Sequence, residues 1–206
     1  MVSARALIDD RPEDSIFRVN RAAFTDPEVF HREMAEIFGR CWLYLCHESQ
    51  VPNHGDYVAA RLGNHPVFVI RGSDGEIRCF YDACSHRGSK LTGRTSGTAK
   101  TLACRYHGWC FNAEGACTLV RGGEDAYRQA DLDRLGTDLR PIEHFAAYKG
   151  FLFGCLDVGA PPLEEFLGGA TPFIDLMADQ APDGMEILRG ESRYIMEANW
   201  KLQTEN

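Results

Sequence analysis

The sequence lacks the features of membrane proteins, secreted proteins and nucleic-acid-binding proteins. No apolar run approaches the roughly 20 residues that a membrane-spanning helix needs, so we expect no transmembrane segment. The amino-terminal residues mix Arg, Asp and Glu without an apolar stretch, which predicts no secretory signal and a cytoplasmic location. Basic residues are few: 22 Lys and Arg stand against 30 Asp and Glu, a net charge of −8. This balance argues against nucleic acid or an anionic membrane as partner.

Cysteine, by contrast, is plentiful. The 206 residues include eight cysteines, which would suit a disulfide framework in a secreted protein. In a cytoplasmic chain they favour reduced thiols or metal ligands instead. Two of the eight belong to motifs described below. The other six mostly lie in apolar segments and are expected to be buried thiols: Cys41, Cys46, Cys79, Cys110, Cys117 and Cys155.

The first regular element predicted is a helix over 26–40. Asp26 is a typical N-cap residue and Pro27 suits the first helical position. Apolar residues then recur at helical spacing and form one face: Phe30, Met34, Ile37 and Phe38. We therefore expect an amphipathic helix ahead of the main domain.

From Cys41 onward, short apolar runs alternate with turn residues, a pattern typical of strands. The expected strands are 42–46, 57–62, 66–71, 77–81, 109–111, 117–120 and 150–156. Such spacing predicts a mainly β fold, an antiparallel sandwich or barrel. The polar stretch 121–140 is expected to be a loop with a short helical piece.

The carboxy-terminal part has a different texture. Pro161-Pro162 precedes two helical patterns that begin near Leu163 and Phe173, and 185–197 is expected to be one extended strand. Asn199 is a plausible N-cap for a further helix. A helix beginning so close to Asn206 would be too short to be stable alone, so we expect the natural chain to continue.

The strongest chemical signal is a pair of motifs, Cys84-Ser85-His86 and Cys104-Arg105-Tyr106-His107. Each motif holds one thiol and one imidazole. Structural zinc modules usually pair Cys with Cys and His with His. The mixed motifs instead favour a two-iron cluster, with both thiolates on one iron and both imidazoles on the other. A zinc site and an unliganded core remain the alternatives.

Residues beside the ligands support this interpretation. Gly88 and Gly108 allow tight turns behind the histidines. Trp109 can exclude water from the site, or simply pack in the core. Tyr106 lies inside the second motif, and Arg87 could steer an acidic redox partner or be solvated. Asp82 is a further candidate, because its carboxylate could accept a hydrogen bond from an imidazole, or it could belong to a turn. Arg105, like Arg87, could steer an acidic redox partner or be solvated.

The two motifs, Cys84–Gly88 and Cys104–Trp109, resemble the Rieske motif of ring-hydroxylating oxygenase large subunits. They are less similar to respiratory Rieske proteins, which add a disulfide cysteine to each loop and place Ser and Tyr where this chain has Trp109 and Phe111. Because hydroxyl donors to the cluster are then fewer, the resemblance implies a low reduction potential, about −150 mV. Further segments resemble the benzoate/anthranilate branch: 30–49, 148–154, 174–177, 184–190 and 199–206.

The resemblance implies the terminal oxygenase of a multicomponent dioxygenase acting on a benzoate-like acid. Its partners would be a reductase, possibly a ferredoxin, and a small (beta) subunit in an alpha3beta3 or alpha3 oligomer. Its cofactors would be a [2Fe-2S] cluster on Cys84, His86, Cys104 and His107, and a mononuclear Fe(II) whose ligands lie beyond Asn206. The chain alone is accordingly expected to be inactive.

The same resemblance implies a division into an arm and helix (1–40), a Rieske domain (41–158) and the start of an α+β catalytic domain (159–206). Two other functions stay open at this point. One is a stand-alone Rieske ferredoxin, an electron carrier without a substrate. The other is the large subunit of a salicylate-type monohydroxylase.

Overall fold

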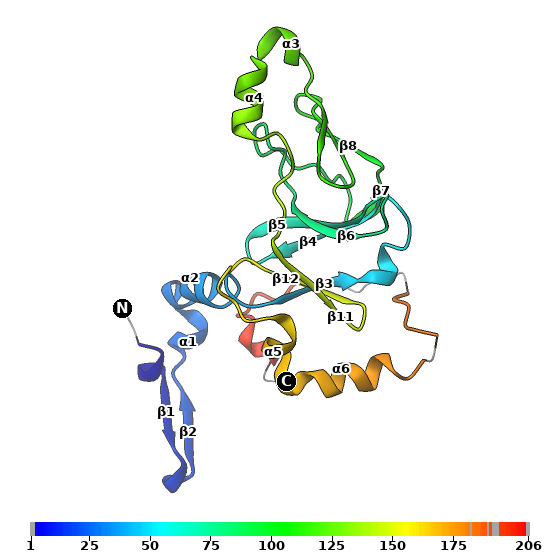
Figure 1. Ribbon diagram of the computed structural model, residues 1–206. Coiled ribbons are helices and arrows are strands. Elements are labelled where there is room, and N and C mark those ends of the chain that lie inside the picture. The colour runs from blue at the N-terminus through cyan, green and yellow to red at the C-terminus, as the bar shows by residue number, and fades with distance from the viewer. Residues whose placement is uncertain (1–2, 182, 189, 191–193, 205–206) are drawn as a thin grey trace. The chain divides into compact units, whose positions relative to one another are not determined.

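The computed structural model describes residues 3–181, 183–188, 190 and 194–204 (Figure 1). Contacts divide the chain into two units, which are described separately: residues 1–37 with 189–206, and residues 38–188. Within the described ranges, no helix is both long enough and apolar enough to cross a membrane.

The described residues of the first unit form a small hairpin and three helices. Strands β1 (Ile8–Arg11) and β2 (Ile16–Val19) pair antiparallel; a short 3-10 turn at Ala4–Leu7 precedes β1, and another at Pro12–Asp14 connects the two strands. Helices α1 (Ala22–Thr25), α2 (Pro27–Glu36) and α7 (Lys201–Thr204) complete it. The hairpin was not predicted, because its strands are exposed and carry no apolar alternation.

Helix α2 confirms the predicted cap. The Asp26 carboxylate accepts a hydrogen bond of 2.8 Å from the Glu28 amide, and Pro27 occupies the first turn. The helix ends at Glu36, so its extension to residue 40 was wrong; Gly39, a poor helix former, lies just beyond. Glu33 of α2 accepts hydrogen bonds from Trp200 Nε1 (2.9 Å) and Lys201 Nζ (2.5 Å), which tie α7 to this helix.

The second unit contains three antiparallel sheets, which confirms the mainly β prediction. A four-stranded sheet has the order β6 (Ile77–Tyr81), β5 (His65–Arg71), β4 (Asp56–Leu62) and β7 (Ser96–Thr98). A three-stranded sheet joins β11 (His144–Tyr148), β12 (Phe151–Cys155) and β3 (Leu43–His47). The third joins β10 (Cys117–Leu119), β9 (Cys110–Asn112) and β8 (Thr101–Ala103).

Strand β5 separates two hydrophobic cores. Its residues Val67, Phe68, Val69 and Ile70 are all fully buried. Because successive side chains of a strand point to opposite faces, Val67 and Val69 enter one core, whereas Phe68 and Ile70 enter the other. The core that contains Val67 and Val69 also holds residues of β3 and β12, so two sheets pack as a sandwich. The core that contains Phe68 and Ile70 also holds residues of β9 and of the two Cys-His motifs.

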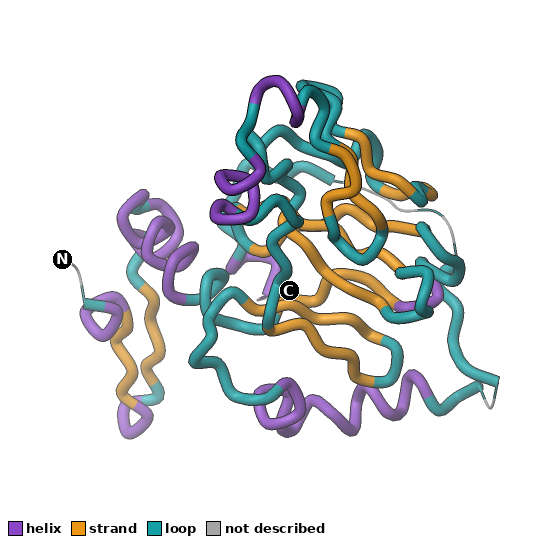
Figure 2. Tube along the Cα trace, turned by 45° about the horizontal axis from the view of Figure 1, so that its top comes forward, coloured by secondary structure: helices purple, strands orange, loops and turns teal. Residues whose placement is uncertain are grey.

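Helices lie outside the strands of this unit (Figure 2). Helices α3 (Gly123–Ala126) and α4 (Gln129–Leu135) occupy the polar stretch where a short helical piece was expected, and α5 (Leu163–Leu167) and α6 (Thr171–Ala178) follow the proline pair. Short 3-10 turns lie at Glu48–Gln50 and Gly168–Ala170. The predicted strand 185–197 was wrong where it can be followed: residues 185–188, 190 and 194–197 are not in a strand, and the others lie outside the described residues.

Candidate metal centre

The two Cys-His motifs fold into matching turns. The Gly88 amide donates to the Cys84 carbonyl (2.8 Å) and the Gly108 amide to the Cys104 carbonyl (2.9 Å). Both glycines have positive φ, +68° and +74°, a conformation that other residues adopt at a cost. The predicted role of Gly88 and Gly108 in tight turns therefore has a geometric basis.

The turns place both thiols in the core. Cys84 and Cys104 are 3% and 4% exposed and hydrogen-bond each other. Burial raises the pKa of the Cys84 thiol above its ordinary value. In Cys104 burial also opposes ionisation, but hydrogen bonds from the Tyr106 and His107 amides outweigh it and lower its pKa. The pair therefore has backbone donors ready to stabilise thiolate charge, as metal ligation requires.

The imidazoles form a second pair. The rings of His86 and His107 lie with centroids 4.6 Å apart. The Nδ1 atoms of both rings are buried and have no hydrogen-bond partner in the described part of the chain. Burial, followed by the nearby His107 and Arg87, lowers the pKa of His86 and favours the neutral ring. Buried polar atoms normally find partners, so two orphaned nitrogens side by side are the arrangement expected of metal ligands.

The side chains are arranged in two pairs rather than one group of four. Among the described residues, no three His, Cys, Asp or Glu side chains meet as a single-ion site would require. A tetrahedral zinc site needs its four ligands around one ion. A [2Fe-2S] cluster needs a thiol pair and an imidazole pair set apart, and the residues present fit that group.

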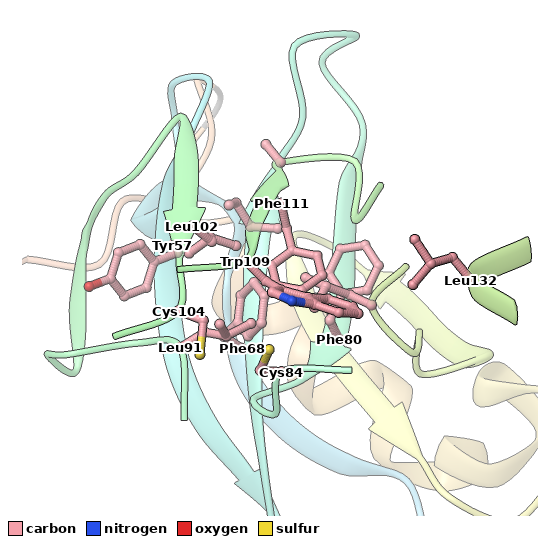
Figure 3. Close-up of a cluster of buried hydrophobic side chains, with 13 residues drawn as sticks. Tyr57, Phe68, Phe80, Cys84, Leu91, Leu102, Cys104, Trp109, Phe111 and Leu132 are labelled. Atoms are coloured by element: carbon pink, nitrogen blue, oxygen red, sulfur yellow. The ribbon is translucent and has the colours of Figure 1, made fainter. Parts of the chain in front are cut away.

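Aromatic rings cover the candidate site. The Trp109 ring stacks on His86, with centroids 4.8 Å apart and 6° between the planes, and Trp109 is 5% exposed. Tyr106 is exposed and lies 3.8 Å from His107, centroid to centroid. Figure 3 shows Trp109 inside the buried hydrophobic cluster, with the sulfur atoms of Cys84 and Cys104 on one side of it.

An open hollow of about 450 Å³ adjoins the imidazoles and is lined in part by arginines. Arg121 packs behind Gly108, and Arg105 packs against Gly93. Arg87 is exposed. No carboxylate pairs with these three arginines within the described part of the chain, so this face carries positive charge in a protein that is acidic overall.

Asp82 has a different role from the imidazole contact considered for it. Its carboxylate, 1% exposed, accepts hydrogen bonds from the amides of Leu91 (2.9 Å) and Thr92 (3.0 Å) and from the Thr92 hydroxyl. The aspartate therefore fixes the segment after the first motif. It supports the site without touching the histidines.

Two residues near the ligands were missed from the sequence. The Tyr127 hydroxyl lies 3.0 Å from His86 Nε2, and the Ser89 hydroxyl bonds to the Cys104 thiol. Tyr127 lies in a charged stretch with no motif spacing, so no pattern indicated it. Ser89 directly follows the first motif, and its position there is a signal that could have been used.

Comparison with known proteins agrees with this geometry. Residues 41–128 match the Rieske [2Fe-2S] domain. Toluate 1,2-dioxygenase subunit alpha from Pseudomonas putida is 44% identical over 98% of this chain and 44% of its own length. Anthranilate 1,2-dioxygenase large subunit from Acinetobacter baylyi is 41% identical over 97% of this chain and 42% of its own length.

A solved structure extends the agreement to the fold. Naphthalene 1,2-dioxygenase from Rhodococcus sp. superposes with a TM-score of 0.84 at 36% identity, over 91% of this chain and 42% of that one. The chain thus spans less than half the length of these relatives. Sequence and structure together show a Rieske [2Fe-2S] domain at residues 41–128, in a chain that is similar over nearly all of its length to part of the large subunits of Rieske aromatic-ring dioxygenases.

Proposed function

We propose that Cys84 and Cys104 hold one iron of the [2Fe-2S] cluster and that His86 and His107 hold the other. The observation that carries this proposal is the pair of buried, unpartnered Nδ1 atoms beside the buried thiol pair. The Gly88 and Gly108 turns fix the ligands, while Trp109 keeps water from them. When bound, the cluster supplies one-electron redox chemistry.

The test is reconstitution of the chain with ferrous iron and sulfide under anaerobic conditions. We expect about two irons per chain, a brown-red colour and a Rieske-type EPR signal after reduction. Cys84→Ser and His107→Ala should abolish the signal. Cys117→Ser is the matched control, because that thiol lies outside the two motifs and hydrogen-bonds the Leu119 carbonyl (3.8 Å) and the Thr137 side chain. A colourless protein that binds one zinc would contradict the proposal.

This Rieske domain would serve as the electron-receiving part of an oxygenase component. Electrons would come from a reductase, with or without a ferredoxin, and pass to a mononuclear Fe(II) held outside the described residues. Arg87, Arg105 and Arg121, which form no ion pair with a carboxylate among the described residues, suit an acidic electron donor, since opposite charges speed association. We also propose a small (beta) subunit as partner and an alpha3beta3 or alpha3 assembly. The proposed domain boundaries lie after residues 40 and 158.

An aromatic acid of the benzoate type is the proposed substrate, with dioxygenation as the reaction. The names of two relatives support it, because toluate and anthranilate are both ring carboxylates and those proteins are 44% and 41% identical to this chain. The naphthalene enzyme is less similar, at 36%. A cytoplasmic location is also proposed. The eight free cysteines support it, because thiols stay reduced in the cytoplasm.

Oxygen consumption by the complete oxygenase, supplied with NADH and a reductase, tests the substrate. We expect turnover with benzoate or 2-aminobenzoate and a cis-diol product or its breakdown product. Turnover restricted to naphthalene would contradict the substrate class. Hydroxylation of salicylate would instead support the monohydroxylase alternative.

A further inference from the structure

Tyr127 contacts the outer edge of one imidazole. Its hydroxyl oxygen lies 3.0 Å from His86 Nε2, and its ring stands at 87° to the imidazole plane. The same ring stands at 81° to Trp109, with centroids 6.0 Å apart. His86 is therefore held on its face by an indole and at its edge by a phenol.

The fold holds Tyr127 in place through the segment around α3 and α4. Tyr127 directly follows α3, and Leu132 of α4 is buried in the same core as the two thiols. Leu139 joins that core further along the chain. The Ser85 hydroxyl donates to the Thr137 carbonyl (2.5 Å), which ties this segment to the first motif. The position of the phenol is therefore set by packing at several points.

The direction of the hydrogen bond follows from the chemistry of the ring. If Nδ1 of His86 binds iron, its lone pair is used and the remaining ring proton is on Nε2. The Tyr127 oxygen must then accept that proton. An acceptor at this position fixes the ring orientation and increases the electron density of the ligand. No described residue offers a corresponding hydrogen bond to His107 Nε2, so the two imidazoles differ.

We propose that Tyr127 is a positioning residue that orients His86 and lowers the reduction potential of the cluster. The inference rests on the proposed ligand set. It makes the two histidines inequivalent, with His86 the more strongly donating ligand. Because extra electron density favours the oxidised state, loss of the hydroxyl is expected to raise the potential.

The test compares Tyr127→Phe with Tyr148→Phe in the reconstituted chain. Tyr148 on β11 is the matched control, because its hydroxyl makes a hydrogen bond of similar length, 2.9 Å to Asp175, and does not line the hollow. Spectroelectrochemical titration at fixed pH should give a higher potential for Tyr127→Phe and an unchanged one for Tyr148→Phe. Pulsed EPR of ¹⁵N-histidine-labelled protein should show a change in one of the two nitrogen couplings.

The outcomes separate this inference from the function it rests on. Failure of the wild-type chain to bind a [2Fe-2S] cluster would overturn the proposed function. A bound cluster whose potential and nitrogen couplings are the same in Tyr127→Phe as in wild type would overturn the role of Tyr127 alone. If Tyr127→Phe does not retain the cluster, 3-fluorotyrosine at position 127 keeps the ring and hydroxyl but weakens the acceptor. A smaller rise in potential then supports the inference, and no rise rejects it.

Discussion

The indole of Trp109 lies parallel to the imidazole of His86, with 4.8 Å between ring centroids and 6° between planes. Trp109→Ala removes this cover and leaves a cavity, and is expected to cost about 3–5 kcal/mol. The cluster should also be lost faster in air, because water then reaches it. Trp109→Phe retains an aromatic ring and should lose the cluster more slowly than Trp109→Ala. Equal rates of visible-absorbance decay in the two variants would show that the ring is not a water barrier.

The Ser89 hydroxyl hydrogen-bonds the Cys104 thiol, the ligand whose pKa is lowered. Because such hydroxyl donors are few, we expect the midpoint potential of the cluster to lie near the low end of the Rieske range, about −150 mV. Ser89→Ala removes a donor that stabilises negative charge on sulfur, so its potential should lie below that of the wild type. Redox titration monitored by circular dichroism measures both values. A wild-type potential above about +100 mV would reject the assignment to the low-potential group.

Two turn glycines provide a matched test of packing beside the site. Gly75 and Gly115 both have positive φ, +87° and +91°. A Cβ on Gly75 meets nothing, whereas one on Gly115 would lie 2.5 Å from Cε1 of the buried Phe80 ring. Gly75→Ala should cost only the backbone strain, about 1–2 kcal/mol. Gly115→Ala should cost about 1–3 kcal/mol more, because Phe80 must move. Urea midpoints of the two variants give the comparison, and equal losses would contradict it.

The ion pair of Asp74 and Arg78 is expected to make the stability of the fold depend on pH in the acid range. A hydrogen bond from Arg78 lowers the pKa of Asp74 to about 2 from an ordinary 3.8. Because the folded pKa is the lower one, this stabilisation is fully present above the ordinary value and is lost as pH falls toward 2. Asp74→Asn should therefore show a shallower fall of the urea midpoint between about pH 4 and 2. Adding Arg78→Gln to this variant should change that slope no further.

The sequence predicted elements with strong local patterns. Strand β6 matches its predicted bounds, and Asp26 caps α2 as expected, since apolar runs and capping chemistry are local. Strand β7 was missed because its residues, Ser96–Thr98, are polar and exposed. It pairs with β4 through long-range contacts that no local pattern encodes.

The candidate site divides in the same way. The four expected ligands come together as two pairs, because their motifs combine spacing with glycine turns. Tyr127 reaches His86 from 41 positions along the chain, through a segment whose sequence is merely polar. Asp82 was expected near an imidazole or in a turn, but burial directs its carboxylate to Leu91 and Thr92. Contacts that depend on tertiary packing could therefore not be predicted from the sequence.

The central strand β5 has one consequence for how this protein can be studied. Val69 belongs to the sandwich core, and its neighbour Phe68 belongs to the core that contains both cysteine ligands. A packing defect on the sandwich side, such as the one made by Val69→Ala, can therefore affect the cysteine ligands only by displacing the backbone of β5. The colour of the bound cluster can then serve as an internal gauge of folding for a sheet face that never touches it.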